Sequence, residues 1–181
     1  MDKKTGLVAF FDILGYQNFL ERNEPETAAG KIAEFMKKLK DFQSKTYLIM
    51  LGEKTEPKIR PILERIKYLV ISDAILLTLE TNKSNKKDYS LFQFFFLMYC
   101  LRLFKELFIY GLPVRGAIEY GEYVLVENQM FAGRPIVRAY QSAMNLDLSA
   151  CQVSDSVVDM PPIFKKFTSH RNLGSGAQGS L

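Results

Sequence analysis

The sequence contains little histidine or cysteine, the residue types that most often provide a general base or a zinc site. Histidine occurs once, as His170 in a polar C-terminal stretch, so a histidine base and a histidine-rich zinc site are not expected. The two cysteines, Cys100 and Cys151, lie in apolar surroundings and have no Cys-x-x-Cys spacing. We therefore expect two buried free thiols rather than a disulfide or a metal site.

The sequence also lacks a hydrophobic run long enough to cross a bilayer. The longest such run covers residues 91–101, is interrupted by Gln93 and is followed by Arg102 and Lys105. The first apolar stretch is broken by Asp12 and does not continue as the hydrophobic region of a signal peptide. These features predict a cytoplasmic protein without a membrane partner.

A strong excess of charge of one sign is missing as well. The 24 Lys and Arg residues exceed the 20 Asp and Glu residues by only four, and no long basic run is present. We therefore expect no nucleic-acid partner, whereas a small anionic substrate is compatible with this balance.

The length of 181 residues, 48% of them hydrophobic, predicts one domain with a full core. We assign residues 1–168 to this domain. Residues 169–181 include the run Gly-Ser-Gly-Ala-Gln-Gly-Ser and are expected to form a flexible polar tail.

Hydrophobic periodicity and turn residues predict alternating strands and helices. Strands are expected from residue 6 to about Asp12, on both sides of Ser72-Asp73 within residues 66–80, and at residues 47–51, 114–120, 123–127 and 151–154. Helices are expected at residues 17–22, 27–44, 89–110, 135–146 and 155–160, with loops at 52–61 and 81–88 and a turn at Gly121-Glu122. This order predicts an α+β fold, ferredoxin-like, with a mainly antiparallel sheet and helices on one face. The phenylalanine-rich helix at 89–110 is apolar almost all round, so we expect it to be largely buried core.

Two carboxylates stand out because of where they occur. Asp12 follows an apolar strand and precedes the glycine turn at Gly15. An aspartate in this position can bind a hard metal ion close to a phosphate, or it can simply cap the helix that follows. Asp73 lies in the Ser72-Asp73 turn, either as a polar hairpin tip or facing Asp12 from an adjacent strand. In the second arrangement the two carboxylates would repel each other unless a cation lay between them.

Four segments, in this order, resemble motifs of the class III nucleotidyl cyclase catalytic domain, the adenylate and guanylate cyclase superfamily. Phe11-Asp12-Ile13-Leu14-Gly15-Tyr16 resembles the first metal motif, and Ser72-Asp73 resembles the second. Val114-Arg115-Gly116-Ala117-Ile118-Glu119-Tyr120-Gly121 resembles the Arg-x-Gly-Ile-x-x-Gly strand. Gly133-Arg134-Pro135-Ile136-Val137-Arg138-Ala139-Tyr140 resembles the Gly-x-x-Val-Asn-x-Ala helix start. Together the segments span most of residues 6–154.

The resemblance implies cyclisation of a nucleoside triphosphate with two Mg²⁺ or Mn²⁺ ions, in a head-to-tail homodimer whose sites lie at the interface. It implies metal ligands at Asp12, Asp73 and the Ile13 carbonyl, and phosphate-binding N–H groups at Leu14, Gly15 and Tyr16. Arg115 is the favoured cation for the base or the phosphates, and Arg138 is a further substrate-binding candidate that could instead be solvated or contact the partner subunit.

The departures from the family pattern bear on the substrate. Leu69 stands where purine cyclases carry a base-reading lysine, and Val137 and Gln141 stand at the ribose-positioning Asn and the transition-state Arg. Ser72 replaces the usual glycine. These differences are similar to those of the pyrimidine cyclases of bacterial anti-phage defence, which implies CTP or UTP as the substrate.

Two other classes of function remain as alternatives. The losses at residues 137 and 141 also suit an inactive, cyclase-like nucleotide sensor or dimerisation module. A ferredoxin-like RNA-binding domain would need exposed aromatic residues on its sheet, whereas the aromatic residues here gather in the helix predicted at 89–110.

Overall fold

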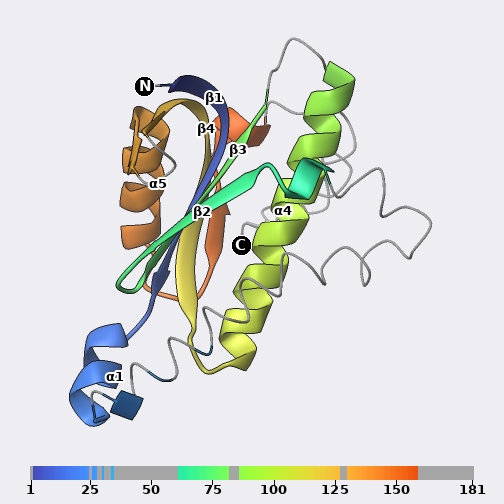
Figure 1. Ribbon diagram of the computed structural model, residues 1–181. Coiled ribbons are helices and arrows are strands. Elements are labelled where there is room, and N and C mark those ends of the chain that lie inside the picture. The colour runs from blue at the N-terminus through green and yellow to red at the C-terminus, as the bar shows by residue number, and fades with distance from the viewer. Residues whose placement is uncertain are drawn as a thin grey trace, which may run out of the picture.

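The computed structural model describes residues 2–24, 26–27, 30, 34, 61–81, 86–126 and 130–158. The predictions for residues 27–44, 47–51, 52–61 and 169–181 lie wholly or almost wholly outside these ranges. The described elements, drawn in Figure 1, are β1 (Asp2–Ile13), α1 (Tyr16–Arg22), β2 (Ile66–Ile71), β3 (Ala74–Glu80), α4 (Lys86–Ile109), β4 (Val114–Val126), β5 (Met130–Ala132), α5 (Arg134–Met144), β6 (Cys151–Val153) and α6 (Asp155–Val158).

The strands form one sheet in the order β2-β3-β1-β4-β5, with β6 also paired to β4. β1 lies between β3 and β4 and pairs antiparallel with both, and among the described strands only the short β6 pairing is parallel. The predicted α+β class with a mainly antiparallel sheet is therefore confirmed.

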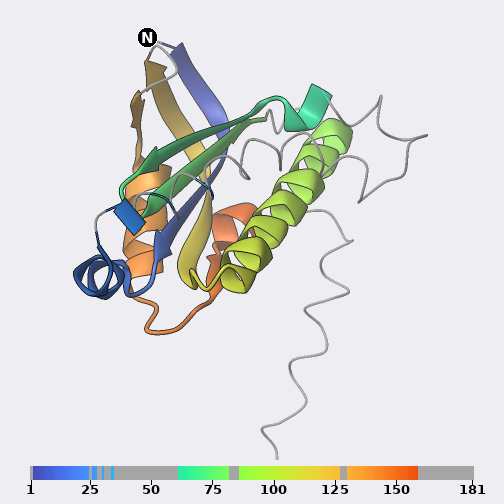
Figure 2. The same ribbon diagram turned by 60° about the horizontal axis from the view of Figure 1, so that its bottom comes forward.

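Side chains of β1 alternate between two apolar environments, which explains why its sequence is continuously hydrophobic. Leu7, Ala9 and Phe11 pack into the core that α4 covers. Val8 belongs to a second cluster on the opposite face, and Phe10 packs there against the ring of Tyr140 in α5. Figures 1 and 2 show the sheet between α4 and α5. The helices thus cover both faces rather than the single face that we expected, because β1 presents apolar side chains in both directions.

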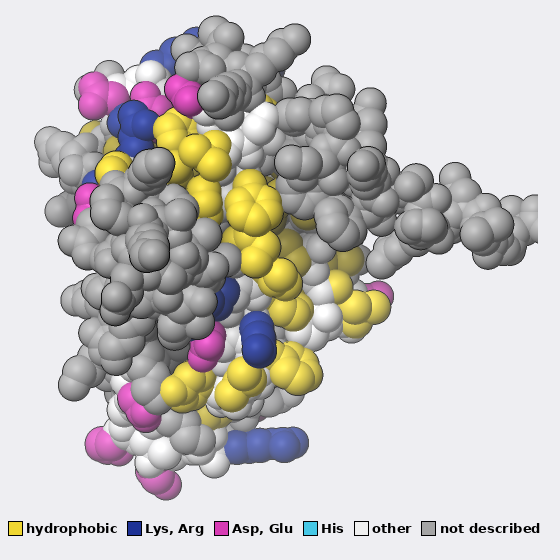
Figure 3. Space-filling model, turned by 90° about the vertical axis from the view of Figure 1, so that its right-hand side faces the viewer, with side chains coloured by type: hydrophobic (Ala, Val, Ile, Leu, Met, Phe, Trp, Pro, Cys, Tyr) yellow, Lys and Arg dark blue, Asp and Glu magenta, His cyan; other side chains and the backbone are white. Residues whose placement is uncertain are grey.

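α4 is the longest described element, and its aromatic residues divide between core and surface. It begins at Lys86, three residues before the predicted start, and buries residues such as Phe96, Tyr99 and Leu103 against the sheet. Leu101 and Phe108 are 60% and 59% exposed, so the helix is not buried all round. Figure 3 looks onto the α4 side of the molecule and shows a band of hydrophobic side chains there. Within the described ranges, no helix is long and apolar enough to span a bilayer.

β4 is a single continuous strand of 13 residues. The predicted turn at Gly121-Glu122 is therefore wrong. Gly121 lies in the middle of the strand opposite Gly6, and its backbone does not adopt a positive φ. Pairing with β1 from residue 114 to residue 125 keeps β4 extended, and β5 then pairs antiparallel with the last residues of β4.

Candidate functional site

The fold brings Asp12 and Asp73 to the same end of the sheet. Asp12 is the next-to-last residue of β1 and pairs with Ala74, the residue that follows Asp73. The Ile13 N–H donates to the Asp73 carbonyl over 3.0 Å, which fixes the hairpin tip beside the end of β1. The predicted hairpin with Ser72-Asp73 at its tip is confirmed. Sixty residues of chain separate the two aspartates, and strand pairing makes them neighbours.

The hairpin tip has an unusual backbone. Ser72 has φ 56°, and it is the one residue other than glycine with a positive φ among those described. A tight turn with a positive φ at its first position usually holds glycine there, because a Cβ is poorly accommodated. Ser72 therefore adopts a conformation that usually requires glycine, and Asp73 follows it in the turn.

Arg115 lies directly opposite Asp12, on the β4 side of β1. Its Nε donates to Asp12 Oδ2 over 2.9 Å. Its Nη1 donates to the carbonyls of Met144 and Leu146 over 3.2 and 3.3 Å. The guanidinium that we favoured for the base or the phosphates is therefore engaged with Asp12 and with the C-terminal end of α5.

The turn after Asp12 distributes its N–H groups unevenly. Leu14 N–H donates to the Pro113 carbonyl over 2.8 Å, so it is already satisfied within the chain. Gly15 has φ 72°, a left-handed conformation that suits glycine, and it is the N-cap residue of α1. The Leu14 N–H is therefore not available to bind a phosphate as we expected, and the phosphate-binding role of the Gly15 and Tyr16 N–H groups stays a prediction.

The two remaining substrate-binding candidates lie in different places. Leu69 is half-buried on β2 and packs with Val8 and Leu76, on the sheet face toward which α5 packs. Arg138 lies on α5, where its Nε is 3.4 Å from Glu119 Oε2 and its Nη2 donates to the Tyr120 carbonyl. Within one chain, Arg138 is therefore tied to a part of β4 beyond Arg115 and is not brought to Asp12.

Glu119 is a buried carboxylate that sequence reasoning missed. The residue is only 5% exposed, and Ser156 Oγ donates to its Oε2 over 3.0 Å in addition to the Arg138 ion pair. The alternation along β4 could have revealed it. Ala117 and Glu119 lie on the same face of this strand, and the residues from 116 to 119 are all buried. Its partners identify it as a structural anchor between β4, α5 and α6.

The structure also contains a cavity of about 580 Å³ at the N-terminal end of α5. Lys3, Glu122, Arg134 and Arg138 contribute charged side chains to its lining. Lys3 is near the start of β1 and Asp12 near its end, so this cavity lies away from the two aspartates.

The donor set at the sheet end fits a hard divalent cation. Two carboxylates and the Ile13 carbonyl provide oxygen ligands only, which Mg²⁺ and Mn²⁺ prefer. Among the described residues, no group of three or more His, Cys, Asp or Glu side chains gathers as a self-sufficient metal site. Mg²⁺ in proteins is commonly held by one or two carboxylates together with oxygens of a substrate phosphate.

Comparison with solved structures identifies the architecture. A rhodopsin-guanylyl cyclase catalytic core with converted specificity, in complex with ATPαS, superposes with a TM-score of 0.61 at 13% identity, over 88% of this chain and 82% of that one. The fold is that of a nucleotidyl cyclase catalytic domain. A bacterial light-regulated adenylyl cyclase gives a TM-score of 0.55 at 11% identity, over 94% of this chain and 82% of that one.

A third cyclase-fold neighbour is the monomeric guanylyl cyclase domain of the RhoGC fusion protein from the aquatic fungus Blastocladiella emersonii. It superposes with a TM-score of 0.52 at 13% identity, over 87% of this chain and 85% of that one. No family model and no curated protein sequence matches the chain. The fold is thus shared with proteins that are only 11–13% identical in sequence to this one.

Proposed function

We propose that the protein is a metal-dependent nucleotidyl cyclase that converts a nucleoside triphosphate to a 3′,5′-cyclic nucleotide and pyrophosphate. The observation that carries the proposal is the juxtaposition of Asp12 and Asp73 at one end of a cyclase-type sheet, joined by the Ile13–Asp73 hydrogen bond. In the reaction, the ribose 3′-oxygen forms a bond to the α-phosphorus, the bond to the β-phosphate oxygen breaks, and the hydroxyl proton is released.

Different residues of this chain would bind the metal ions and the phosphates. Asp12, Asp73 and the Ile13 carbonyl would hold two Mg²⁺ or Mn²⁺ ions, which supply activation of the hydroxyl and charge neutralisation when bound. The N–H groups of Gly15 and Tyr16 would bind the phosphates at the turn before α1. The triphosphate needs cations to offset its own charge, and the bound metal ions would supply them.

We propose a pyrimidine nucleotide, CTP or UTP, as the substrate, and a role as a cytoplasmic second-messenger enzyme in anti-phage defence. Support comes from the resemblance to pyrimidine cyclases and from Leu69, which is apolar where purine cyclases carry a base-reading lysine. Leu69 is half-buried beside Leu76, so its surroundings offer apolar contact rather than a charged hydrogen bond to a purine edge.

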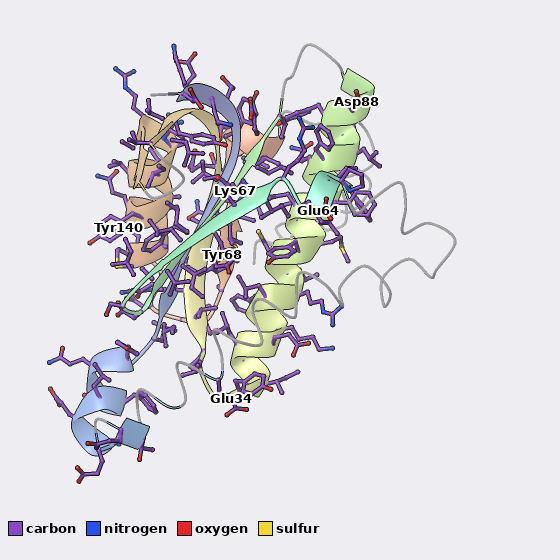
Figure 4. All side chains as sticks on the ribbon, viewed as in Figure 1. Glu34, Glu64, Lys67, Tyr68, Asp88 and Tyr140 are labelled. Carbon is purple, nitrogen blue, oxygen red and sulfur yellow. The ribbon has the colours of Figure 1, made fainter. Side chains whose placement is uncertain are left out.

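We propose further that the active unit is a head-to-tail homodimer formed through the face of the sheet that carries α5. Large apolar side chains are exposed on this side: Ile71 is 63%, Val137 54% and Tyr140 49% exposed. Figure 4 places Tyr140 on α5, on the side of the sheet away from α4. Covering such side chains stabilises association, and a partner's α5 could complete each site.

The decisive experiment incubates the full chain with ATP, GTP, CTP or UTP plus Mn²⁺ and measures pyrophosphate and cyclic product. One pyrimidine nucleotide is expected to dominate. Asp73→Asn should abolish turnover and leave thermal unfolding nearly unchanged, whereas the matched change Asp2→Asn, on an exposed residue at the far end of β1, should retain turnover. Unchanged product formation by Asp73→Asn would end the metal assignment.

The second candidate function is a nucleotide sensor without turnover. It is favoured by Val137 and Gln141, which are exposed on α5 where active relatives would present Asn and Arg. The same assay separates the two: the sensor would bind a nucleotide, as measured by calorimetry, and release no pyrophosphate with any of the four.

A further inference from the structure

Arg115 connects three segments that are distant in the sequence. It lies on β4, its Nε contacts Asp12 of β1, and its Nη1 contacts the carbonyls of Met144 and Leu146 at the end of α5. Its Nη2 is 3.1 Å from Met144 Sδ. All three nitrogens of the guanidinium therefore have partners in the same chain.

The ion pair between Arg115 and Asp12 is largely shielded from water. The side chains of Arg115 and Asp12 are 23% and 16% exposed, so their ion pair is screened less than a surface pair. The last turn of α5 contains no basic residue of its own. Arg115 thus supplies the cation that the carbonyl end of a helix favours, and it does so from a neighbouring strand.

The geometry also defines how Asp12 is held. Oδ2 accepts the Arg115 hydrogen bond, which fixes the rotation of the carboxylate and leaves Oδ1 as the oxygen that can bind a cation. A direct contact from Arg115 Nε to a phosphate would require breaking the bond to Asp12, and a contact from Nη1 would require releasing the carbonyls of Met144 and Leu146. Each of these is a charge-assisted hydrogen bond, the stronger class.

We propose that Arg115 is a positioning residue, which sets the orientation of Asp12 toward the metal by anchoring it to the end of α5. The inference rests on the proposed function, because it assigns the metal to Asp12. It differs from the role expected from sequence, in which the Arg115 guanidinium itself touches the base or the phosphates.

The test measures Mn²⁺ binding to the full chain without nucleotide, by electron paramagnetic resonance of the free ion. Arg115→Ala should raise the Mn²⁺ dissociation constant by roughly 10- to 100-fold, the usual loss when a residue that orients a metal ligand is removed. Arg115→Lys should not restore binding, because a single ammonium cannot bond the carboxylate and the helix end in the fork geometry of a guanidinium.

The matched control is Lys4→Ala, which removes a cation from the same strand as Asp12. Lys4 Nζ is 2.9 Å from Glu80 Oε2, so this variant also breaks a cross-strand ion pair, at the other end of β1. The Mn²⁺ dissociation constant should stay unchanged in Lys4→Ala. Thermal unfolding of every variant is recorded, and Arg115→Lys decides the question if Arg115→Ala does not fold.

Four outcomes distinguish the possibilities. Unchanged or tighter Mn²⁺ binding by the folded Arg115 variants, with intact binding by the wild type, overturns the positioning role alone. A raised Michaelis constant for nucleotide with unchanged Mn²⁺ binding would instead make Arg115 a substrate contact and would also overturn it. A wild-type protein that binds no Mn²⁺ without nucleotide overturns the positioning role, whereas a wild-type protein that releases no pyrophosphate from any of the four nucleotides overturns the proposed function.

Discussion

Phe11 packs its ring directly over the backbone of Gly116, its partner across β1 and β4. A Cβ at residue 116 would lie 2.4 Å from Phe11 Cδ1 and 2.8 Å from the Phe10 carbonyl oxygen. The ring can take this place only because residue 116 has no side chain. Phe11 immediately precedes Asp12, so the packing of this ring supports the proposed metal ligand.

The first prediction is that Gly116→Ala destabilises the protein. The ring of Phe11, which is fully buried, would have to move, and overpacking of a core typically costs about 1–3 kcal/mol. We expect a loss of about 3 kcal/mol in the free energy of unfolding, measured by urea denaturation. The matched control is Gly121→Ala on the same strand, where a Cβ would meet Pro135 Cγ at an ordinary 3.4 Å. Equal stability of the two variants would contradict this explanation.

The second prediction concerns the hairpin tip. Replacing Ser72 with glycine should raise the free energy of unfolding by up to about 1 kcal/mol, because φ 56° is costly for a residue with a Cβ. Ser72→Val should lower it by about 1–2 kcal/mol, since a branched side chain tolerates this conformation least. Thermal and urea unfolding measure both changes. Ser72→Ala is the control for the hydroxyl, and a large effect of that variant would show that the hydroxyl matters more than the backbone.

The third prediction is a loss of stability at alkaline pH that depends on Tyr123. The pKa of the Tyr123 hydroxyl is raised to about 12 from its usual 10, mainly by burial. A hydrogen bond with Thr78 lowers this pKa somewhat, and the charge of Glu80 raises it further. The folded state therefore disfavours the phenolate. The stabilising contribution of the neutral Tyr123 hydroxyl to the free energy of unfolding is complete below pH 10. It is lost as the pH rises toward 12, by about 1.4 kcal/mol per pH unit.

Denaturant unfolding at several pH values between 8 and 12 measures this slope, and Tyr123→Phe should make it shallower. The thiol of Cys151, whose burial raises its pKa to about 12, contributes a slope in the same direction and remains in the variant. The difference between the two proteins isolates the tyrosine. Identical slopes would mean that the Tyr123 hydroxyl is not desolvated.

The fourth prediction separates a structural from a substrate role for Arg138. Arg138→Ala removes one of the partners of the buried Glu119 carboxylate, and we expect a loss of about 1 kcal/mol, because Arg138 itself is half exposed. A double-mutant cycle with Glu119→Gln should show coupling of a similar size. Unchanged stability together with a raised Michaelis constant for nucleotide would instead support the substrate-binding prediction.

Local sequence patterns predicted the elements that depend on neighbouring residues. The apolar run before Asp12, the Ser72-Asp73 turn, the phenylalanine-rich helix and the Pro135 helix start all lie within a few residues of their predicted positions. Each is determined by side-chain periodicity or by the φ preferences of turn residues, which are properties of short segments. The same patterns failed at Gly121, because a glycine and a polar neighbour form a turn in isolation but remain extended when another strand pairs with them.

Tertiary structure decided which of these elements meet. Only the pairing of β1 with β4 places Asp12 against Arg115, 103 residues away, and only the packing of α5 brings the carbonyls of Met144 and Leu146 to the same guanidinium. Local sequence patterns are enough to predict that an acidic residue ends the first strand and that an arginine lies near the start of a later one. Whether that arginine faces solvent, substrate or the aspartate depends on strand register and on helix packing, which are set by burial across the whole chain.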